Sequence, residues 1–433
     1  MASVNTRELI METLLSVTRD GEYSHIVLRN VLEKYQFLTK QDRAFITRVT
    51  EGTLERMIEI DYIINQFSKV KVNKMKPVIR TIIRSAVYQM KYMDGVPNSA
   101  VCNEAVKLAE KKGFVNLKGF VNGVLRNIAR NLENLTYPDR KNTVRWLSVT
   151  YSMPEWIVKQ WLSVYDEQTV EKMLRDFLTE KPTTIRCNLN QISKEALILK
   201  LKNEGVQVEE HHLLPYALFI SGYDYLGALQ SFCDGDFQVQ DVSSMLVAEW
   251  ADPKEGDCVV DVCAAPGGKA LHLADKLGGT GYVEARDLSD YKVGLIEENI
   301  HRTGVQNIRA VRWDATILDE NMVGKADIVI ADLPCSGLGV LGKKTDLKYK
   351  MTEEKEEELI SLQREILDVV QSYVKPGGKL LYSTCTVHRG ENEENAAWFV
   401  KRHPHFTLRQ EKQMLPGTDS CDGFYIALFT RKE

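Results

Sequence analysis

Residues 259–269, Val259-Val260-Asp261-Val262-Cys263-Ala264-Ala265-Pro266-Gly267-Gly268-Lys269, decide the fold of the second half of this chain. Their pattern predicts an apolar strand, a tight turn of small residues and the start of a helix. Small residues let a ligand approach the backbone, and a helix N-terminus offers free N–H groups to a carboxylate or phosphate. The turn matches neither GxxxxGK[ST] nor GxGxxG, which disfavours a nucleoside triphosphate or a dinucleotide.

Outward from this turn, strands and helices alternate from Gly235 to the end of the chain. Such alternation predicts an α/β, Rossmann-like domain with a mostly parallel sheet and helices on both faces. The strands are expected near 258–262, 281–286, 308–312, 326–332, 378–383 and 424–429. The helices are expected near 242–250, 268–277, 289–303, 355–374 and 392–402.

Acidic residues follow successive strands of this predicted sheet. Asp287 ends the second strand, about twenty residues beyond the turn, where an acid binds a ribose diol in related architectures. Asp314 follows the third strand and Asp332 closes the fourth. Buried unpaired carboxylates are costly, so the set is hard to explain by packing and favours a nucleoside-bearing cofactor, although any one acid could lie in a surface loop.

Two cysteines end two of the apolar runs. Cys385 follows Lys379-Leu380-Leu381-Tyr382-Ser383-Thr384, and Cys335 follows the run that begins at Ala326. Ligands bind outside the carboxyl ends of strands in open α/β sheets, so both thiols could face one substrate. A single cysteine at such a place is more often an inert small hydrophobe. As a pair, they predict Cys385 as the catalytic nucleophile and Cys335 as its companion.

The composition bounds the class of protein. The 433 residues predict two or three domains, and 44% hydrophobic with 27% charged residues is typical of a soluble globular protein. There is no run of the roughly 20 apolar residues that a membrane helix needs and no signal peptide, so we expect a cytoplasmic protein without membrane contact. Eight cysteines without CxxC pairs or Cys/His clusters argue against disulfides and a metal site. The net charge of -4 gives no global case for nucleic acid.

Two further segments precede the Rossmann-like domain, which we place at residues 235–433. Apolar residues recur at helical spacing over residues 1–140, which predicts an all-helical bundle. Residues 141–234 predict a helical linker and a small α+β unit. In its first strand Arg186 and Asn188 share one face, which suits either RNA phosphates and base edges or plain solvent.

Part of the bundle resembles a known family. Leu38 to Gly52 and Gly113 to Arg130, which carries Asn and Gly inside a helical pattern, look like the RNA-binding helical domain of the transcription antitermination factor NusB. The resemblance implies RNA contact from this bundle, with Arg126 as the residue expected to make it.

The second half resembles another family more closely. Residues 263–269, Asp332-Leu333-Pro334-Cys335-Ser336-Gly337 and Ser383-Thr384-Cys385 look like motifs I, IV and VI of the S-adenosylmethionine-dependent RNA cytosine-5 methyltransferases. With the NusB-like domain in front, the chain is similar to the bacterial members of the Sun or Fmu type that act on 16S ribosomal RNA. The resemblance implies S-adenosyl-L-methionine as cofactor and ribosomal RNA, free or in an assembling small subunit, as partner of a monomer. It implies a cofactor site made of Cys263, Ala264, Ala265, Pro266, Gly267, Gly268, Lys269, Asp287, Asp314 and Asp332.

The same resemblance implies roles for the reacting groups. Cys385 attacks C6 of the cytosine, and Cys335 completes elimination and product release. From its position three residues before Cys335, Asp332 is expected to hydrogen-bond the N3 and amino edge of the base and so to orient it. Lys269, or the helix N-terminus beside it, is expected to lower the pKa of a thiol. Two departures from the family pattern, Arg286 before the ribose acid and Leu333 before Pro334, bear on cofactor affinity.

The sequence is also compatible with three other functions. A DNA cytosine methyltransferase would use the Pro-Cys cysteine, Cys335, as its nucleophile. The target could be another RNA, such as a transfer RNA. A non-catalytic RNA-binding or ribosome-assembly factor could also keep the fold.

Overall fold

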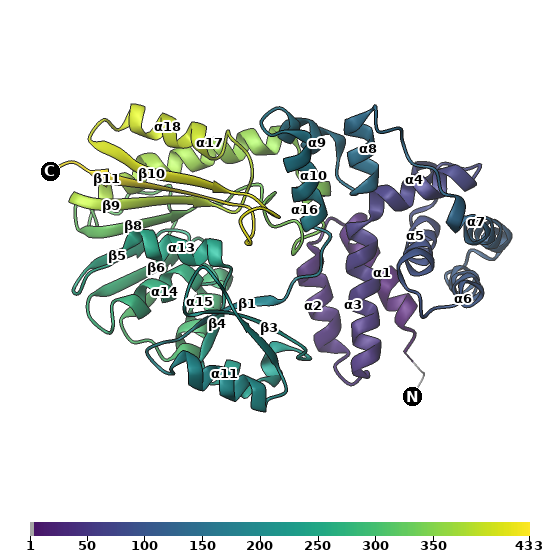
Figure 1. The fold of residues 1–433 in the computed structure, drawn as a ribbon, viewed down its shortest axis with the longest axis horizontal. Coiled ribbons are helices and arrows are strands. Elements are labelled where there is room, and N and C mark those ends of the chain that lie inside the picture. The colour runs from purple at the N-terminus through teal and green to yellow at the C-terminus, as the bar shows by residue number, and fades with distance from the viewer. Residues whose placement is uncertain (1–3) are drawn as a thin grey trace. The chain divides into compact units, whose positions relative to one another are not determined.

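The computed structural model describes residues 4–433, and the chain divides into two compact units (Figure 1). The helical unit comprises the chain up to Thr179 together with the segment Leu341–Lys350. The sheet unit comprises Glu180–Val340 and Met351–Glu433.

The helical unit confirms the prediction of an all-helical N-terminal domain. Its core is built around α5, which begins at Pro77, a residue whose fixed φ suits the first helical turn. The buried face of α5 includes Ile79, Ile82, Ile83 and Val87. The helices of the unit are α1 (Thr6–Thr18), α2 (Ser24–Lys34), α3 (Lys40–Glu55), α4 (Met57–Phe67), α5 (Pro77–Tyr92), α6 (Asn98–Lys111), α7 (Lys118–Arg130), α8 (Thr143–Thr150), α9 (Glu155–Leu162), α10 (Glu167–Asp176) and α16 (Leu347–Lys350), with short 3-10 turns at Val72–Lys74, Val115–Leu117 and Leu132–Asn134.

The segment Leu341–Lys350 returns from the second half of the chain into the helical unit. The buried Asp346 carboxylate accepts hydrogen bonds from the backbone N–H and the hydroxyl of Ser24, at 3.1 and 2.6 Å. Lys348 is also buried, and its ammonium donates to the carbonyl of Glu55 at 2.8 Å. Burial lowers the pKa of Lys348 to about 7. The segment is thus an integral part of the helical core.

The first part of the sheet unit is a small four-stranded antiparallel sheet in the order β2-β3-β1-β4. It confirms the predicted α+β unit. Its elements are β1 (Thr183–Cys187), α11 (Lys194–Asn203), β2 (Gln207–Glu210), β3 (Ala217–Ser221), a 3-10 turn at Leu226–Ala228, α12 (Gln230–Cys233) and β4 (Phe237–Val239).

The larger sheet has seven strands in the order β10-β11-β9-β8-β5-β6-β7. Neighbours from β9 through β7 run parallel, whereas β11 is antiparallel to β9 and β10 is antiparallel to β11. The mostly parallel sheet expected from the alternation is therefore confirmed. The strands are β5 (Cys258–Asp261), β6 (Tyr282–Asp287), β7 (Ile308–Arg312), β8 (Ala326–Asp332), β9 (Val374–Thr384), β10 (Phe406–Met414) and β11 (Phe424–Arg431).

Strand β10 has no counterpart among the strands expected from the sequence. It forms an edge of the sheet and carries the exposed run Arg409-Gln410-Glu411-Lys412 at its centre. Charged side chains are usual on edge strands, where they prevent pairing with other chains, but they hide the apolar alternation that reveals a strand.

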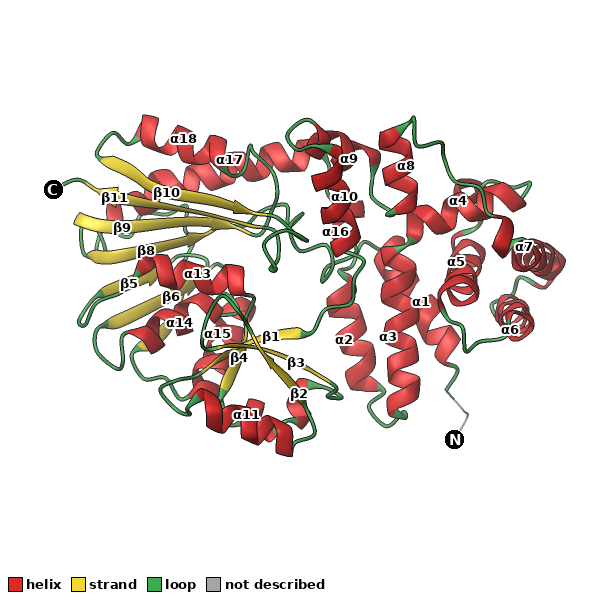
Figure 2. Ribbon diagram, viewed as in Figure 1, coloured by secondary structure: helices red, strands yellow, loops and turns green. Residues whose placement is uncertain are grey.

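Helices cover both faces of the larger sheet, as Figure 2 shows. Successive strand residues point to opposite faces: Val259, Ile330 and Leu381 belong to one apolar core, whereas Val260 and Val329 belong to the other. The first core includes residues of α13 (Val242–Ala251), α14 (Gly268–Lys276) and α15 (Asp290–Thr303). The second includes residues of α17 (Glu353–Val370), which is followed by a 3-10 turn at Gln371–Tyr373, and of α18 (Glu393–Arg402).

Candidate active site

The turn after β5 is held by an acid from the neighbouring strand. Gly267 has φ +103°, a left-handed conformation that favours glycine, and α14 starts at the next residue. The Asp287 carboxylate at the end of β6 accepts a hydrogen bond from the N–H of Ala265 at 3.0 Å and lies 3.0 Å from the Lys292 ammonium. A Cβ on Gly268 would meet only Gln240, at 3.9 Å, so the entrance to the helix is open to a ligand.

Asp261 is a carboxylate that the sequence analysis did not assign to the site. It ends β5 and is buried, and among the described residues no donor has standard hydrogen-bond geometry to either of its oxygens, although the backbone N–H of Cys263 is close enough to lower its pKa. Burial raises the pKa of Asp261 to about 8, with the Asp332 carboxylate acting in the same direction and Lys269 opposing it. A buried carboxylate without a hydrogen-bond donor is a place where a ligand donor is expected to bind.

Lys269 and Asp332 form an ion pair at the carboxyl end of the sheet. The ammonium lies 2.7 Å from Asp332 Oδ2, and the hydroxyl of Ser383 donates to Asp332 Oδ1 at 2.7 Å. Burial by itself lowers the pKa of Lys269, but the Asp332 carboxylate, together with Asp261 and Cys385, raises it above its ordinary value. Lys269 is therefore a fixed positive charge within reach of the Cys385 sulfur.

The two cysteines are side by side. Cys335 Sγ lies 3.3 Å from Cys385 Sγ, and both residues are partly buried thiols that are not joined in a disulfide. The hydrogen bond with Cys385 and then burial raise the pKa of Cys335 well above its ordinary value, with the charges of Cys385, Glu391 and Asp332 adding to the effect. Cys335 is thus held as a neutral thiol beside its partner.

The remaining residues predicted to bind the cofactor also lie at the carboxyl ends of the strands. Ala264 is buried, Cys263 and Ala265 are partly buried, and Pro266 is exposed. Asp314, after β7, accepts hydrogen bonds from the N–H and hydroxyl of Thr316 at 2.9 and 2.7 Å, and these bonds lower its pKa. Its carboxylate is therefore partly engaged in its own turn.

The two departures from the family pattern have a structural explanation. Arg286 alternates with Asp287 along β6 and so points away from it. Its buried guanidinium pairs with Glu284 and with Asp319, in the latter case at 2.6 Å. Leu333 is buried in the apolar core on the α17 side of the sheet. Neither side chain replaces a polar group of the site.

The structure corrects the expectation for Arg186 and Asn188, which were to face RNA from one strand of the small sheet. Both are buried: Arg186 donates to Gln240 at 2.9 Å and pairs with Asp275, and Asn188 donates to the carbonyl of Gly235 at 3.1 Å. The strand face that they share is turned into the protein, so their polar groups are used internally. Arg126, in contrast, is exposed on α7.

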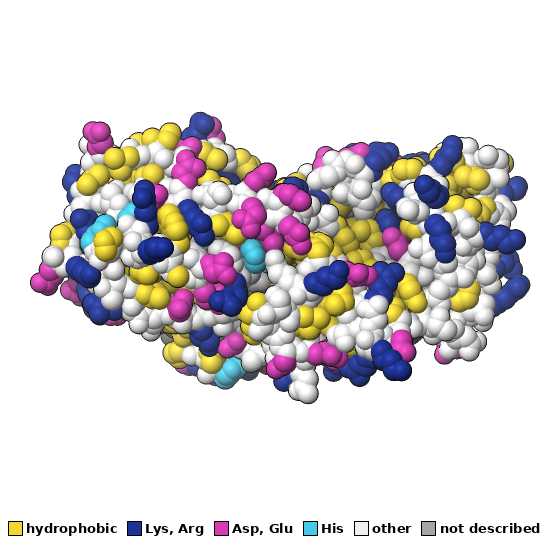
Figure 3. All heavy atoms as spheres, turned by 90° about the horizontal axis from the view of Figure 1, so that it is seen from above, with side chains coloured by type: hydrophobic (Ala, Val, Ile, Leu, Met, Phe, Trp, Pro, Cys, Tyr) yellow, Lys and Arg dark blue, Asp and Glu magenta, His cyan; other side chains and the backbone are white. Residues whose placement is uncertain are grey.

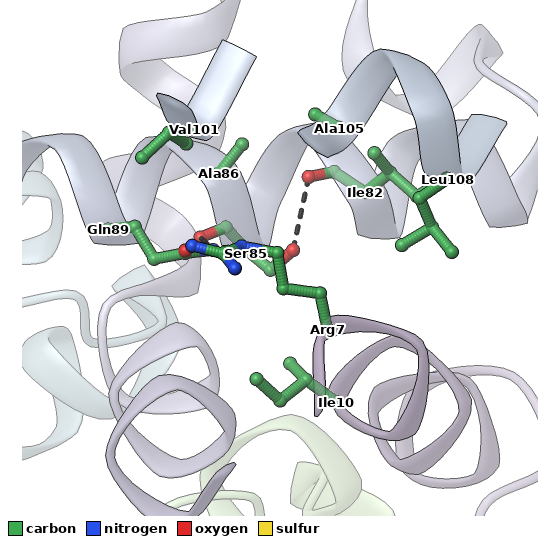
Figure 4. Close-up of a pocket in the computed structure, with 9 residues that line it drawn as sticks. All are labelled: Arg7, Ile10, Ile82, Ser85, Ala86, Gln89, Val101, Ala105 and Leu108. Atoms are coloured by element: carbon green, nitrogen blue, oxygen red, sulfur yellow. Dashed lines mark hydrogen bonds between the residues drawn. The ribbon is translucent and has the colours of Figure 1, made fainter. Parts of the chain in front are cut away.

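A small pocket also lies within the helical unit, between α1, α5 and α6 (Figure 4). Its polar side is made by Arg7, Ser85 and Gln89, and Arg7 Nε already donates to Gln89 Oε1 at 3.1 Å. The rest of its wall is apolar. The Ser85 hydroxyl donates to the carbonyl of Ile82 at 3.1 Å, and Gln89 Nε2 donates to the carbonyl of Ser85 at 3.0 Å. It offers no reacting group.

Three family models match consecutive parts of the chain. Residues 4–130 match the NusB family, residues 153–223 match the ferredoxin-like domain of RsmF/B-like methyltransferases, and residues 248–430 match the 16S rRNA methyltransferase RsmB/F. Among curated proteins, one from Bacillus subtilis (strain 168), named probable ribosomal RNA small subunit methyltransferase B, is 35% identical and aligns over 100% of both chains. The ribosomal RNA small subunit methyltransferase B of Escherichia coli O127:H6 is 28% identical over 99% of each chain.

Solved structures share the fold of this chain. The crystal structure of PH0851 has a TM-score of 0.84 and 25% identity, and covers 100% of this chain and 99% of that one. NSun6 from Pyrococcus horikoshii, solved with SFG, shares the fold over 65% of this chain and 98% of its own, with a TM-score of 0.59 and 23% identity. Among the described residues, no helix is long and apolar enough to cross a membrane. The chain therefore belongs to the RsmB/F family of 16S ribosomal RNA methyltransferases and has the fold that binds S-adenosylmethionine.

Proposed function

We propose that this protein methylates C5 of a cytosine in 16S ribosomal RNA through a covalent bond between Cys385 and C6 of the base. The observation that carries the proposal is the pair of thiols, 3.3 Å apart, beside the Lys269–Asp332 ion pair. Cytosine C5 is a poor nucleophile until a group adds to C6, which makes C5 enamine-like. Two thiols and an acid at the carboxyl ends of adjacent strands can serve both the addition of a thiolate to C6 and its later elimination.

S-adenosylmethionine fits the residues around the turn after β5, where it would supply the methyl group. Its amino group and ribose hydroxyls are donors, and the acids Asp261, Asp287 and Asp314 offer acceptor oxygens. The first turn of α14 offers N–H groups to its carboxylate. We therefore assign cofactor binding to residues 263–269 and these acids, together with Asp332.

Cys385 is proposed as the nucleophile because Lys269 stabilises negative charge on its sulfur. Asp332 is proposed to accept hydrogen bonds from a protonated N3 and from the amino group of the base, which favours addition to C6. Its bonds to Lys269 and Ser383 fix the carboxylate in position. The base must leave its stack to reach these groups, which favours a single-stranded or junction target.

Cys335 is proposed to act after methyl transfer. Its raised pKa keeps it protonated next to the Cys385 sulfur, so it is poorly suited to attack and well placed to assist departure of the Cys385 thiolate. In this elimination the C5 proton passes to water and the C6–S bonding electrons return to the Cys385 sulfur, which takes a proton from Cys335.

RNA that contains 5-fluorocytosine tests these assignments, because fluorine at C5 blocks elimination and traps the covalent complex. Wild type and Cys335→Ala are expected to form the complex, and Cys385→Ala is expected to form none. The reverse pattern would show that Cys335 is the nucleophile, as in the DNA cytosine methyltransferases. Denaturing electrophoresis followed by peptide mass spectrometry identifies the attached cysteine.

We also propose that the helical unit binds the RNA backbone through the surface that carries Arg126. Residues 62–93 contain seven Lys or Arg and no acid, and residues 111–132 likewise contain no acid. The exposed Lys69, Lys71 and Lys74 follow α4, whose Phe67 carbonyl accepts a hydrogen bond from Asn127 of α7 at 3.2 Å. Figure 3 shows Lys and Arg side chains gathered over the visible face of the helical unit, at the right. Such a surface suits phosphates.

Replacing Lys69, Lys71 and Lys74 together by Ala tests this surface. RNA affinity should fall uniformly across sequences, and the slope of log affinity against log salt should decrease by about 2. Lys107, paired with Glu104 at 2.8 Å on α6, gives a control substitution that should leave the slope unchanged. An unaltered slope in the triple variant would place the RNA elsewhere.

Bisulfite mapping of 16S ribosomal RNA from cells with and without the protein tests the substrate. One cytosine should lose its protection when the protein is absent. A change confined to transfer RNA would move the substrate there. If no methylated cytosine is lost from either RNA and the protein still binds RNA, a non-catalytic assembly factor would be favoured.

A further inference from the structure

The loop between β9 and α18 carries a buried carboxylate next to the thiols. Glu391 is fully buried, and its carboxylate accepts hydrogen bonds from the N–H of Ser336, at 2.9 Å, and from the Ser336 hydroxyl. Gln363 of α17 donates from Nε2 to Glu391 and to the carbonyl of Pro334, both at 2.9 Å. The residues on either side of Cys335 are thus held by Glu391 and Gln363.

The next residue, Asn392, does the same for the other thiol. Its Oδ1 accepts a hydrogen bond from the Thr384 hydroxyl at 2.5 Å, and its Nδ2 donates to the carbonyl of Thr386 at 3.1 Å. The residues on either side of Cys385 are therefore held by one amide. Asn392 is itself fully buried and fixed by Gln413, whose Oε1 accepts from Nδ2 at 2.7 Å.

A hydroxyl pair links the two halves. Ser336 Oγ lies 2.6 Å from Thr386 Oγ1, and both side chains are buried. A series of hydrogen bonds therefore connects Glu391 to Ser336, Ser336 to Thr386 and Thr386 to Asn392. Ser336 directly follows Cys335 in the sequence, and Thr386 directly follows Cys385. From this arrangement we infer that Glu391 and Asn392 are positioning residues that hold Cys335 and Cys385 in the geometry needed for catalysis. The inference rests on the proposed two-thiol reaction.

Energetics favour a functional reason for a carboxylate here. A buried charge is costly unless it is paired. Apolar side chains of the same volume would stabilise the fold at least as much as this buried carboxylate does. Glu391 is balanced by His388, whose Nδ1 lies 3.4 Å from it and whose Nε2 lies 3.8 Å from Glu356. Burial alone lowers the pKa of His388, but these two carboxylates raise it above its ordinary value. The resulting cluster keeps a carboxylate beside the Cys335 turn.

Paired substitutions at Thr386 separate positioning from folding. Thr386→Val removes the hydroxyl while keeping the shape, and Thr386→Ser keeps the hydroxyl. We expect Thr386→Val and Glu391→Gln to lower kcat by on the order of 10²-fold, since a misplacement of about 1 Å can cost that much. KM for RNA and the Kd of S-adenosylmethionine should not change. Thr386→Ser should restore most of the lost rate.

Thr303→Val is the matched control, because it also deletes a buried hydroxyl in the sheet unit, one that donates to the carbonyl of Asn299 at 2.7 Å. Its kcat should equal that of wild type, while its melting temperature should fall by about as much as that of Thr386→Val. Wild-type kcat in both Thr386→Val and Glu391→Gln would overturn the inference, as would failure of Thr386→Ser to recover activity.

The assay is release of tritium from C5-labelled cytosine in 16S ribosomal RNA. If wild type releases tritium and the variants match it, only the positioning role is lost. If wild type transfers methyl groups without releasing tritium, the cytosine-C5 reaction is wrong and the positioning role is lost with it.

Discussion

Cys335 Sγ and Cys385 Sγ lie 3.3 Å apart although fifty positions separate them in the chain, since each follows the carboxyl end of one of two adjacent parallel strands, β8 and β9. This proximity makes the pair sensitive to oxidation. Diamide should join them in a disulfide, with the two thiols losing two protons and two electrons that reduce diamide to the hydrazine. Covalent complex formation with 5-fluorocytosine RNA should disappear and return after dithiothreitol.

Peptide mass spectrometry should find the Cys335–Cys385 linkage. Cys263, whose pKa is raised by burial, should remain a thiol under the same treatment. If the oxidised protein loses activity while both active-site thiols stay free, another cysteine would be responsible.

Removal of the Lys269 charge should impair catalysis more than folding. Lys269→Met leaves Asp332 with the Ser383 hydroxyl as its remaining side-chain partner in the described structure and takes away the cation near Cys385. We expect kcat to fall by about 10²- to 10³-fold, as for loss of one electrostatic stabiliser. Initial rates with labelled S-adenosylmethionine measure this. Lys276→Met, on the same helix, breaks the 2.7 Å pair with Glu249 and should keep the wild-type kcat.

Asp261 should make the free energy of unfolding depend on pH. Its pKa is about 8 in the folded protein, above the ordinary value, so the folded state binds more protons than the unfolded state between the two values. Stability from this group is therefore full at low pH and is lost as pH rises through the folded pKa. Asp261→Asn should remove that loss, and so be more stable than wild type at about pH 9.

Denaturant unfolding of the ligand-free protein across this pH range measures the difference. The Asn variant should also bind S-adenosylmethionine more weakly, because an amide replaces an acceptor carboxylate. A wild-type stability that rises with pH over the same window, with no change in the variant, would contradict the assignment.

Gly339 should not tolerate a side chain. Its N–H donates to the carbonyl of Cys385 at 3.1 Å, and a Cβ at this position would lie 2.0 Å from the carbonyl oxygen of Gly423. Gly339→Ala should cost about 1–3 kcal/mol in unfolding free energy through overpacking and should displace the turn that carries Cys335. Trapping of RNA by the variant, compared with Gly294→Ala on α15, measures the effect. Gly294 has open space around its Cβ position, so its variant should behave as wild type.

Much of the fold was accessible from local patterns. The alternation of strands and helices after Gly235, the small-residue turn at 263–268 and the helical spacing of the first 140 residues each depend on neighbours in sequence, and the structure confirms the architecture that they predict. The edge strand β10 was not predicted from the sequence, because its central residues are charged and exposed and so show no apolar alternation.

The sequence by itself determined the fold class, the family and the residues at the carboxyl ends of the strands, because periodicity and motif spacing are local properties of a chain. Only the tertiary structure decided which of those residues meet. The Lys269–Asp332 pair joins residues 63 positions apart, and Asp346 reaches Ser24 across 322. Arg186 was assigned to the surface because alternation reports a shared strand face, but not whether that face is covered. Glu391 carries no local signal at all, since its role depends on donors brought to it by two other segments of the fold, the turn with Ser336 and the helix with Gln363.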